Sequence, residues 1–254
     1  LFRSKYFDKL TGVSTVVEYA SEFKERVGTL PSTSLVVFIS QSGETADTIS
    51  ALREAKAKGF STLSITNVKQ STLAREADYS LFTEAGAEIS VASTKAFTAQ
   101  VSLLMGLAIH WGNRRNTINL SAALNLQDKM AYLPELVTQT LKQDCPIRAI
   151  AQELLSSSHF FFLGKGILFP IALECALKLK EISYSFAEGY PSGELKHGPL
   201  ALINNQSTVI ILAPGLQSSI SEIDAENILL QEKMMSSLQR SEEHTSELQS
   251  HHDL

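Results

Sequence analysis

A cluster of hydroxyl side chains follows a hydrophobic run in the first third of the chain. The run is Leu35-Val-Val-Phe-Ile39, and the segment Ser40-Gln-Ser-Gly-Glu-Thr45 comes directly after it, before a helical pattern. A strand, a short loop and a helix N-terminus together present unpaired backbone N–H groups and the positive end of a helix dipole. Ser40, Ser42 and Thr45 add neutral donors. We therefore expect this loop to bind an anion, in particular the phosphate monoester of a small sugar.

Simple helix capping is the alternative interpretation of the same loop. Ser42 or Thr45 could cap the helix without any ligand, and Glu44 and Asp47 are the acids expected in a first turn. Those carboxylates would repel a phosphate unless they point away from it. Gly43 permits a tight turn and a close approach of the backbone to a ligand. The loop lacks the Gly-Lys-Ser/Thr end of a P-loop, and no G-x-G-x-x-G opens a helix, so a nucleotide is not expected.

A second helix start led by a serine occurs at Val91-Ala-Ser-Thr-Lys-Ala-Phe97. Taken alone, Ser93 is a natural N-cap, because its side-chain oxygen can accept a bond from the first turn of the helix. This segment on its own therefore predicts a helix boundary and leaves a ligand-binding role open.

Three charged residues form a stripe on the predicted helix Pro170–Ser183. Glu174, Lys178 and Glu181 are spaced by four and three residues, which places them on one side of an otherwise apolar helix. Ion pairs facing solvent are one interpretation, and each would contribute only a few tenths of a kcal/mol. If the stripe is partly buried, Glu181 could instead be a general base beside a lysine.

A histidine follows this helix in the segment Gly189–Pro199. His197 is the residue type best suited to move protons near neutral pH, and Gly198-Pro199 constrains the backbone directly after it. A histidine in a loop is more often a plain surface residue, so its role depends on what surrounds it.

Composition limits the classes of protein to consider. The chain has 254 residues, of which 44% are hydrophobic and 19% charged, so it can bury a core and is not expected to be disordered. The net charge of −5 argues against a nucleic-acid partner. Cys145 and Cys175 have no metal-ligand spacing and fit reduced thiols. No apolar run approaches the ~18–20 residues needed to span a bilayer. These features predict a cytoplasmic protein without a membrane segment.

The order of the elements predicts an α/β fold with parallel sheets covered by helices. The expected strands are Thr15–Tyr19, Leu35–Ile39, Thr62–Thr66, Tyr79–Phe82, His159–Leu163 and Thr208–Leu212. The expected helices are Glu44–Lys58, Thr94–Trp111, Ala122–Lys142, Ile147–Ser156, Pro170–Ser183 and Ser219–Leu238. Because the runs 34–40 and 207–213 are alike, we expect two related lobes, at 1–133 and 147–239, joined by a helical linker at 134–146.

The last residues do not follow this pattern. The segment 240–254 is polar and has no hydrophobic period, and its beginning, Arg240-Ser-Glu-Glu-His-Thr-Ser-Glu-Leu-Gln-Ser250, resembles the translation of a common sequencing-library adapter. We expect it to be a non-native tail rather than a natural solvated one. On this interpretation the second lobe is cut short at its C-terminal end.

Four segments together resemble one enzyme family. They are Ser40–Thr48, Val91–Phe97, Ala176–Tyr184 and Gly193–Pro199. In order and spacing they are similar to the isomerase half of glutamine–fructose-6-phosphate aminotransferase (isomerizing), or glucosamine-6-phosphate synthase. The resemblance runs from about Leu1 to Ala213 and weakens toward Gln239. It implies two SIS (sugar isomerase) lobes, each a flavodoxin-like doubly wound parallel sheet with helices on both faces, the second incomplete.

The resemblance also implies roles for individual residues. Those that would hold the phosphate and sugar of fructose 6-phosphate are Ser40, Gln41, Ser42 and Thr45, with Val91 and Ser93 nearby. Glu181 is similar to the base that moves a proton from C1 to C2 of the aminated sugar, and Lys178 to the lysine beside it. His197 is similar to a ring-opening histidine that reaches in from the partner subunit, which implies a homodimer.

The implied reaction makes glucosamine 6-phosphate and glutamate from fructose 6-phosphate and glutamine. Neither ring opening nor the proton transfer needs a metal or redox cofactor, so we expect none. Three parts of the family pattern are absent from this sequence: the N-terminal glutaminase domain, the first strand with its Gly-Thr-Ser loop, and the C-terminal tail with its sugar-binding lysine. We therefore expect this stretch of chain by itself to be inactive with glutamine.

Two other functions compete with this interpretation. A transcriptional regulator with SIS lobes would bind a sugar phosphate through the same serines but would not need Lys178, Glu181 and His197. A stand-alone SIS deglycase or aldose–ketose isomerase would keep them and act on another sugar phosphate. The presence of these three residues favours an enzyme over a sensor.

Overall fold

The computed structural model describes residues 2–213, and the side chains from Tyr6 onward. The chain divides into two compact units, with the boundary between Tyr132 and Leu133. We describe each unit by itself. No helix within residues 2–213 has both the length and the hydropathy required to cross a bilayer.

A three-stranded parallel sheet forms the centre of the first unit. Its strands are β1 (Leu35–Ile39), β2 (Ser61–Thr66) and β3 (Tyr79–Phe82), in the order β1-β2-β3. Helix α3 (Ala46–Ala57) connects β1 to β2, and α4 (Thr72–Glu76) connects β2 to β3. Since the strands are parallel, the loops that follow β1, β2 and β3 all lie at the same edge of the sheet.

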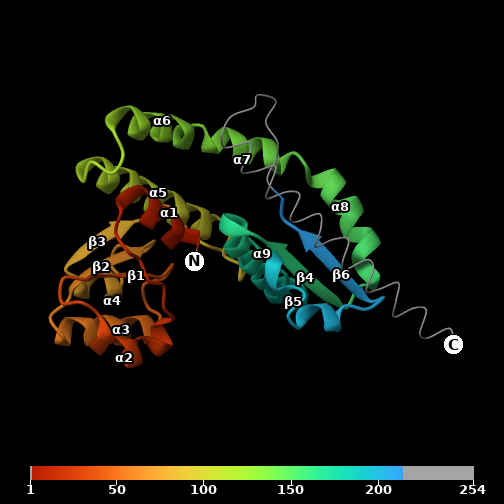
Figure 1. Ribbon diagram of the computed structural model, residues 1–254, viewed down its shortest axis with the longest axis horizontal. Helices are drawn as coiled ribbons and strands as arrows, with labels where there is room; N and C mark the ends of the chain where they lie inside the picture. The colour runs from red at the N-terminus through yellow and green to blue at the C-terminus, as the bar shows by residue number, and fades with distance from the viewer. Residues whose placement is uncertain (1, 214–254) are drawn as a thin grey trace. The chain divides into compact units, whose positions relative to one another are not determined.

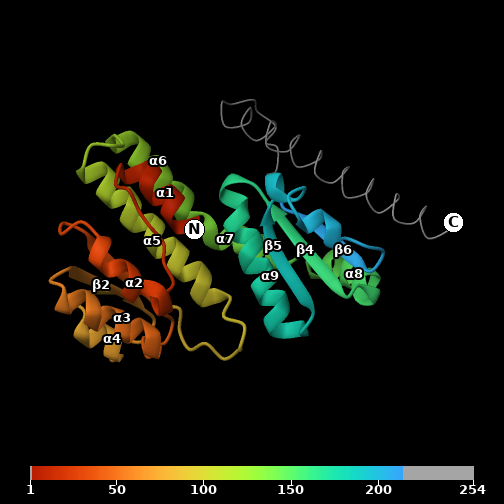
Figure 2. The same ribbon diagram turned by 60° about the horizontal axis from the view of Figure 1, so that its bottom comes forward.

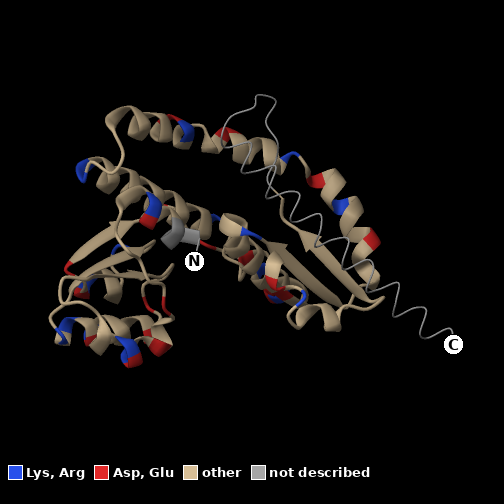
Figure 3. Ribbon diagram, viewed as in Figure 1, with Lys and Arg blue, Asp and Glu red and all other residues tan. Residues whose placement is uncertain are grey.

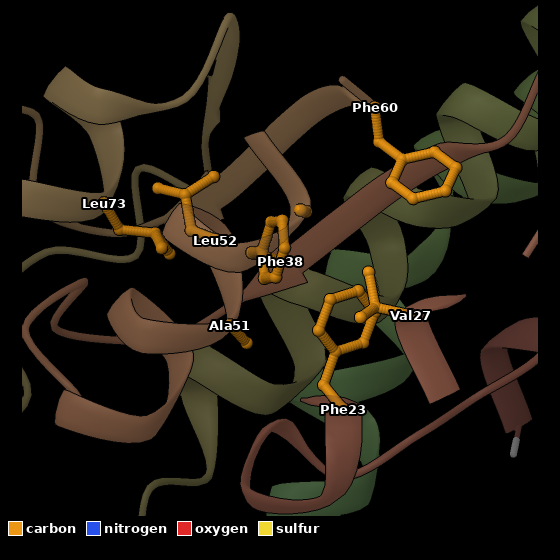
Figure 4. Close-up of a cluster of buried hydrophobic side chains, with 8 residues drawn as sticks. Phe23, Val27, Phe38, Ala51, Leu52, Phe60 and Leu73 are labelled. Atoms are coloured by element: carbon orange, nitrogen blue, oxygen red, sulfur yellow. The ribbon is translucent and has the colours of Figure 1, made fainter. Parts of the chain in front are cut away.

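Helices lie on both faces of this sheet (Figures 1 and 2). The helices α2 (Phe23–Arg26), α3 and α4 lie on one face, and α1 (Phe2–Thr11), α5 (Lys95–Arg114) and α6 (Leu120–Ala131) lie on the other. The core beneath α3 contains Phe38 of β1 together with Leu52, Leu73 and Phe23 (Figure 4). Leu52 and Leu73 have no exposed surface, and burial of one such side chain stabilises the fold by roughly 1.5–3 kcal/mol.

The second unit is built on another three-stranded parallel sheet. Its helices and strands are α7 (Leu133–Leu141), α8 (Asp144–Glu153), β4 (His159–Gly164), α9 (Phe169–Ser183), β5 (Phe186–Pro191) and β6 (Ser207–Ile211). The strand order is β5-β4-β6, so β4 is central. Two short 3-10 turns, Ser192–Glu194 and Pro199–Leu202, lie between β5 and β6.

The central strand β4 is buried on both faces because its side chains alternate. Phe160 and Phe162 pack with Ala172 and Ala176 of α9, whereas Phe161 and Leu163 pack with Leu195 and Ile203 from the segment after β5. The two faces of the sheet are thus covered by different parts of the chain, α9 on one and residues 195–203 on the other. A continuous run of apolar residues, without alternating polar residues, is typical of a strand buried on both faces.

The structure confirms most of the expected elements. Strands β1 and β3 have the expected bounds, β2 and β4 differ by one residue at one end, and β6 is shifted by one residue toward the N-terminus. The strand expected at Thr15–Tyr19 is wrong: these residues form no ladder, and Val16, Val17 and Tyr19 are exposed. The strand β5 was not expected. The single helix expected over 122–142 is two helices, α6 and α7, which divide at Tyr132.

Two expectations lie outside the described residues, namely the helix at 219–238 and the non-native tail at 240–254. The segment 134–146, expected to be a helical linker, is part of α7, the turn after it and the start of α8.

Candidate active site

The loop Ser40–Thr45 connects the end of β1 to α3 and is held by its own hydroxyl groups. The Ser40 side chain is buried, and its oxygen accepts a hydrogen bond from the Gly43 N–H at 3.0 Å. Ser40 Oγ and Thr45 Oγ1 are 3.1 Å apart, so one hydroxyl donates to the other. One hydroxyl hydrogen of this pair remains for a ligand.

The bonds made by the hydroxyl groups do not match the capping alternative. Thr45 is the N-cap residue of α3, yet its side chain makes no capping hydrogen bond. The Ser42 oxygen accepts from the Glu44 N–H at 3.2 Å, within the loop and not within the first turn of α3. The N–H groups of that first turn have no acceptor within the helix, as at every helix start. The loop therefore combines donors from the backbone and from hydroxyl side chains, as an anion requires.

Glu44 is turned toward α4. Its carboxylate accepts a hydrogen bond from the Thr72 N–H at 2.7 Å. This bond holds the pKa of the Glu44 carboxyl below its ordinary value. The interaction engages the negative charge that would otherwise oppose an anion in the loop.

Gly43 is required both by its backbone angle and by its neighbour. Its φ is +68°, in the left-handed region that favours glycine, and a Cβ atom there would lie 2.2 Å from Ser71 Oγ. Ser71 is the N-cap of α4 and accepts from the Ala74 N–H. The loops that follow β1 and β2 are therefore packed directly against each other.

Asn67, which the sequence did not single out, joins the three loops at this edge of the sheet. Its backbone N–H donates to the Gln41 carbonyl at 3.0 Å. Its side-chain oxygen accepts from Thr83 Oγ1 and from the Ala85 N–H, and its amide nitrogen donates to the Gly86 carbonyl at 2.6 Å. An asparagine directly after a strand was its only signal in the sequence.

The second serine-led loop precedes α5, and its geometry corrects one expectation. The N-cap of α5 is Thr94, not Ser93. Ser93 Oγ instead donates to Glu88 Oε2 at 3.2 Å, and the same oxygen accepts from the Ala96 N–H at 3.3 Å. Val91 is 89% exposed. The N-terminal end of α5 is thus capped by the carboxylate of Glu88, a residue that the sequence patterns did not reveal.

The charged stripe on α9 is a close, partly buried cluster. Lys178 Nζ lies 2.6 Å from Glu181 Oε2 and 3.6 Å from Glu174 Oε1. The side chains of Lys178 and Glu181 are 20% and 32% exposed. Figure 3 shows acidic and basic residues close together on this helix. The expected pair is therefore formed, and its partial burial fits the acid–base interpretation better than a fully solvated stripe.

His197 lies far from Glu181 within one chain. Glu181 is near the C-terminal end of α9, about 18 Å along the helix from its start, whereas His197 follows the opposite end of the neighbouring strand β5. The segment of His197 also covers the opposite face of the sheet from α9, through Leu195 and Ile203. His197 itself is exposed, and its N–H donates to the Glu194 carbonyl.

The first unit contains hydroxyl and backbone donors, and the second unit contains a carboxylate–ammonium pair. Within the described residues, no group of three or more His, Cys, Asp or Glu side chains is arranged to hold a metal ion. The arrangement suits binding of a phosphate monoester in the first unit and proton transfer in the second.

Comparison with known families decides the class. The model of the SIS domain matches residues 2–110 and 153–249. The chain belongs to the SIS domain family. The first match covers the sheet of the first unit and most of α5, and the second begins at the end of α8 and includes β4, α9, β5 and β6. The prediction of an α/β fold with two SIS lobes is confirmed.

Curated relatives of this SIS chain share one name. The chain is 44% identical over 232 residues to "Glutamine--fructose-6-phosphate aminotransferase [isomerizing]" of Aliivibrio fischeri, covering 89% of this chain and 38% of that protein. It is 47% identical over 214 residues to the protein of the same name from Bradyrhizobium diazoefficiens, covering 84% and 35%. The SIS chain thus spans less than two fifths of the length of these relatives.

A solved structure agrees with this comparison. The C-terminal domain of glucosamine-fructose-6-phosphate aminotransferase from Francisella tularensis superposes with a TM-score of 0.85 at 38% identity. The match covers 94% of this chain and 64% of that one. The resemblance inferred from the four sequence motifs is therefore confirmed at the level of sequence and fold.

Proposed function

We propose that this SIS chain forms the sugar-isomerising half of an enzyme that makes glucosamine 6-phosphate and glutamate from fructose 6-phosphate and glutamine. The observation that carries this proposal is the 2.6 Å contact between Lys178 and Glu181 on α9. A protein that only senses a sugar phosphate needs donors for the phosphate but no positioned base. The glutaminase activity belongs to a further domain of the full-length protein, in line with the greater length of the relatives.

In this mechanism the first unit binds the phosphate. The hydroxyl groups of Ser40, Ser42 and Thr45 donate to the dianion, and the N-terminal end of α3 adds the positive end of its dipole. Gln41 lies within the same loop, and Val91 and Ser93 in the loop before α5 contact the sugar. Binding through the phosphate leaves C1 and C2 of the sugar free to react.

The second unit supplies the acid–base chemistry. After amination, C2 of the open-chain sugar is an imine carbon. One proton must move from C1 to C2, and the hydroxyl proton on C1 must pass to the imine nitrogen, so that C1 becomes the aldehyde and C2 carries the amine. Glu181 accepts the C1 proton and returns it to C2, while the ammonium group of Lys178 holds the carboxylate in place. His197 assists ring opening by transferring a proton at the ring oxygen.

We propose further that His197 acts on the substrate of a partner subunit in a homodimer. Within one chain, the sheet of the second unit separates the segment of His197 from α9. The surface next to Glu181 also supports an interface, because Ile182 and Tyr184 are 65% and 93% exposed. Two chains related by a two-fold axis could bring each His197 to the other chain's Glu181.

Two alternative functions and the cellular location of the protein remain predictions. A transcriptional regulator would keep the phosphate loop, but the Lys178–Glu181 pair favours an enzyme. A stand-alone SIS deglycase or isomerase would keep both features. A cytoplasmic location fits free thiols at Cys145 and Cys175.

Replacement of the base tests the proposal. In the full-length protein, Glu181→Gln keeps the shape of the side chain and removes its basic carboxylate, so kcat should fall about 10²–10⁴-fold. Affinity for fructose 6-phosphate should stay within about threefold, because the phosphate donors are in the other unit. The matched control is Glu188→Gln on β5, which pairs with Lys180 at 3.4 Å and should leave kcat unchanged. A Glu181→Gln protein that keeps half of its turnover would contradict the proposal.

A further inference from the structure

Glu88 makes the least expected interaction in the first unit. It lies in the loop between β3 and α5, where its carboxylate is half-buried. One oxygen, Oε2, accepts both from Ser93 Oγ at 3.2 Å and from the Ala96 N–H at 3.3 Å. Next to it, Lys95 Nζ donates to the Ala87 carbonyl, which fixes the same loop to the start of α5.

This bond determines which way the Ser93 hydroxyl group points. An ionised carboxylate can only accept hydrogen bonds, so the single hydroxyl hydrogen of Ser93 is directed at Glu88. The Ser93 oxygen then has only lone pairs left, and it can only accept from a ligand. A phosphate dianion has no hydrogen to give, whereas every sugar hydroxyl group has one.

Ser42 in the phosphate loop has the opposite hydrogen-bonding role, because it can donate to a ligand. Its oxygen accepts from the Glu44 N–H at 3.2 Å, and among the described residues its hydrogen is donated to no protein atom. That hydrogen is therefore available to a ligand oxygen. Two serines in different loops of the first unit are thus set by their partners, one as a donor and the other as an acceptor.

We propose that Glu88 is a positioning residue that fixes Ser93 as an acceptor for a hydroxyl group of the bound sugar. The loop 88–96 then recognises the sugar, and the loop 40–45 recognises the phosphate. This inference rests on the proposed function, because it needs a sugar phosphate in the first unit. It adds the residue that makes the site selective for a polyhydroxylated chain over a bare phosphate monoester.

A pure capping role for Glu88 is the alternative, and one substitution separates the two. Both bonds go to the same oxygen, Oε2, so Glu88→Ala removes the cap of α5 and frees the Ser93 hydroxyl hydrogen together. Without the carboxylate, Ser93 is no longer fixed as an acceptor. A capping role predicts that the affinity for both ligands changes alike or not at all, whereas the positioning role predicts a loss of affinity that is specific to the sugar and depends on Ser93.

The experiment compares two ligands on the full-length protein by calorimetric titration. Fructose 6-phosphate carries the phosphate and the hydroxyl groups, and propyl phosphate carries the phosphate alone. Glu88→Ala should weaken binding of fructose 6-phosphate about tenfold, the size expected for the loss of one hydrogen bond to the sugar. The Kd of propyl phosphate should not change. Glu84→Ala, in the same loop and paired with Lys69, is the matched control.

A double-mutant cycle protects the test against a change in folding. Ser93→Ala should also weaken the binding of fructose 6-phosphate and not of propyl phosphate. Glu88→Ala added to Ser93→Ala should have almost no further effect on this binding, because Glu88 acts through Ser93. The role of Glu88 would be overturned by an equal loss of affinity for both ligands, by no loss for either, or by additive effects in the cycle. Each of these results would leave the proposed function standing. A wild-type chain that binds neither ligand would overturn the phosphate site itself, and the inference with it.

Discussion

The two units place their polar groups on different parts of the same strand–helix–strand arrangement. In the first unit the hydroxyl groups follow the end of β1, in the loop Ser40–Thr45. In the second unit the loop after β4 has no hydroxyl group, and a Cβ on Gly164 would lie 2.3 Å from the Leu168 carbonyl oxygen. The backbone itself closes over the strand end, and the charged groups lie on α9 instead.

This difference corresponds to two requirements of one reaction. A phosphate needs several donors around a point, which a loop at a helix N-terminus supplies. A proton transfer needs one carboxylate held in a fixed orientation, which a helix with a neighbouring lysine one turn away supplies. The comparison predicts that changes in the first unit alter binding, and that changes in the second alter turnover.

The largest effect should come from mixing inactive subunits. In the full-length protein, Glu181→Gln and His197→Asn should each lower kcat about 10²–10⁴-fold. If His197 serves the partner's site, a mixed dimer has one site with both native residues. Random mixing of equal amounts should then restore about a quarter of the wild-type activity. The measurement is glucosamine 6-phosphate formation after co-expression.

A control mixture excludes simple rescue by dimerisation. Glu181→Gln subunits mixed with subunits carrying both substitutions have no site with two native residues, so this mixture should stay inactive. Recovery there, or no recovery in the first mixture, would mean that His197 does not act across the interface.

A smaller effect is expected from the phosphate loop. In the full-length protein, Ser42→Ala with Thr45→Ala removes two donors, and a hydrogen bond to a charged group contributes about 1.5–3 kcal/mol. KM for fructose 6-phosphate should rise at least about tenfold, with kcat nearly unchanged. Thr138→Ala with Thr140→Ala on α7, whose hydroxyls donate only to their own helix, is the matched control. An unchanged KM would return Ser42 and Thr45 to a role in local structure.

Much of the fold was predictable because buried strands consist mostly of apolar residues. The strands β1 and β4 are apolar on both faces, so their runs stand out in the sequence. The strand β5 was missed because it contains Glu188, Gly189 and Pro191, which indicate a loop. Gly189 is there for packing: a Cβ would lie 2.8 Å from the Leu173 Cα of α9. The opposite error occurred at Thr15–Tyr19. The β-branched residues of this segment indicated a strand, but the segment has no neighbouring strand to pair with.

The candidate site was predictable to the extent that its contacts are local. The spacing of Lys178 and Glu181 places them one turn apart on any helix, so the sequence could predict their pair. Asn67 and Glu88 act on loops that follow other strands or start other helices, and their roles depend on how these loops meet. Residues of this kind have no spacing signature. The separation of His197 from Glu181 also required the arrangement of the sheet.

The smallest expected effect concerns the acid sensitivity of the first unit, where Asp78 holds β2 beside α4. Its carboxylate accepts from Thr62 Oγ1 at 2.8 Å and pairs with Lys56 at 3.0 Å. The Thr62 hydroxyl group and Lys56 hold the pKa of the Asp78 carboxyl below its ordinary value. A lowered pKa of Asp78 stabilises the folded state at pH values above the pKa of an aspartate in the unfolded chain, about 3.9. This contribution is lost as the pH falls through the lower pKa of the folded state.

Asp78→Asn should therefore be less stable than wild type at pH 7, and the difference should shrink toward zero below about pH 4. Trp111, the sole tryptophan, lies in α5 of this unit, so urea unfolding followed by its fluorescence reports on the first unit. Glu54→Gln on α3 is the control, and a stability difference for Asp78→Asn that stays constant with pH would show that packing, not charge, makes this residue important.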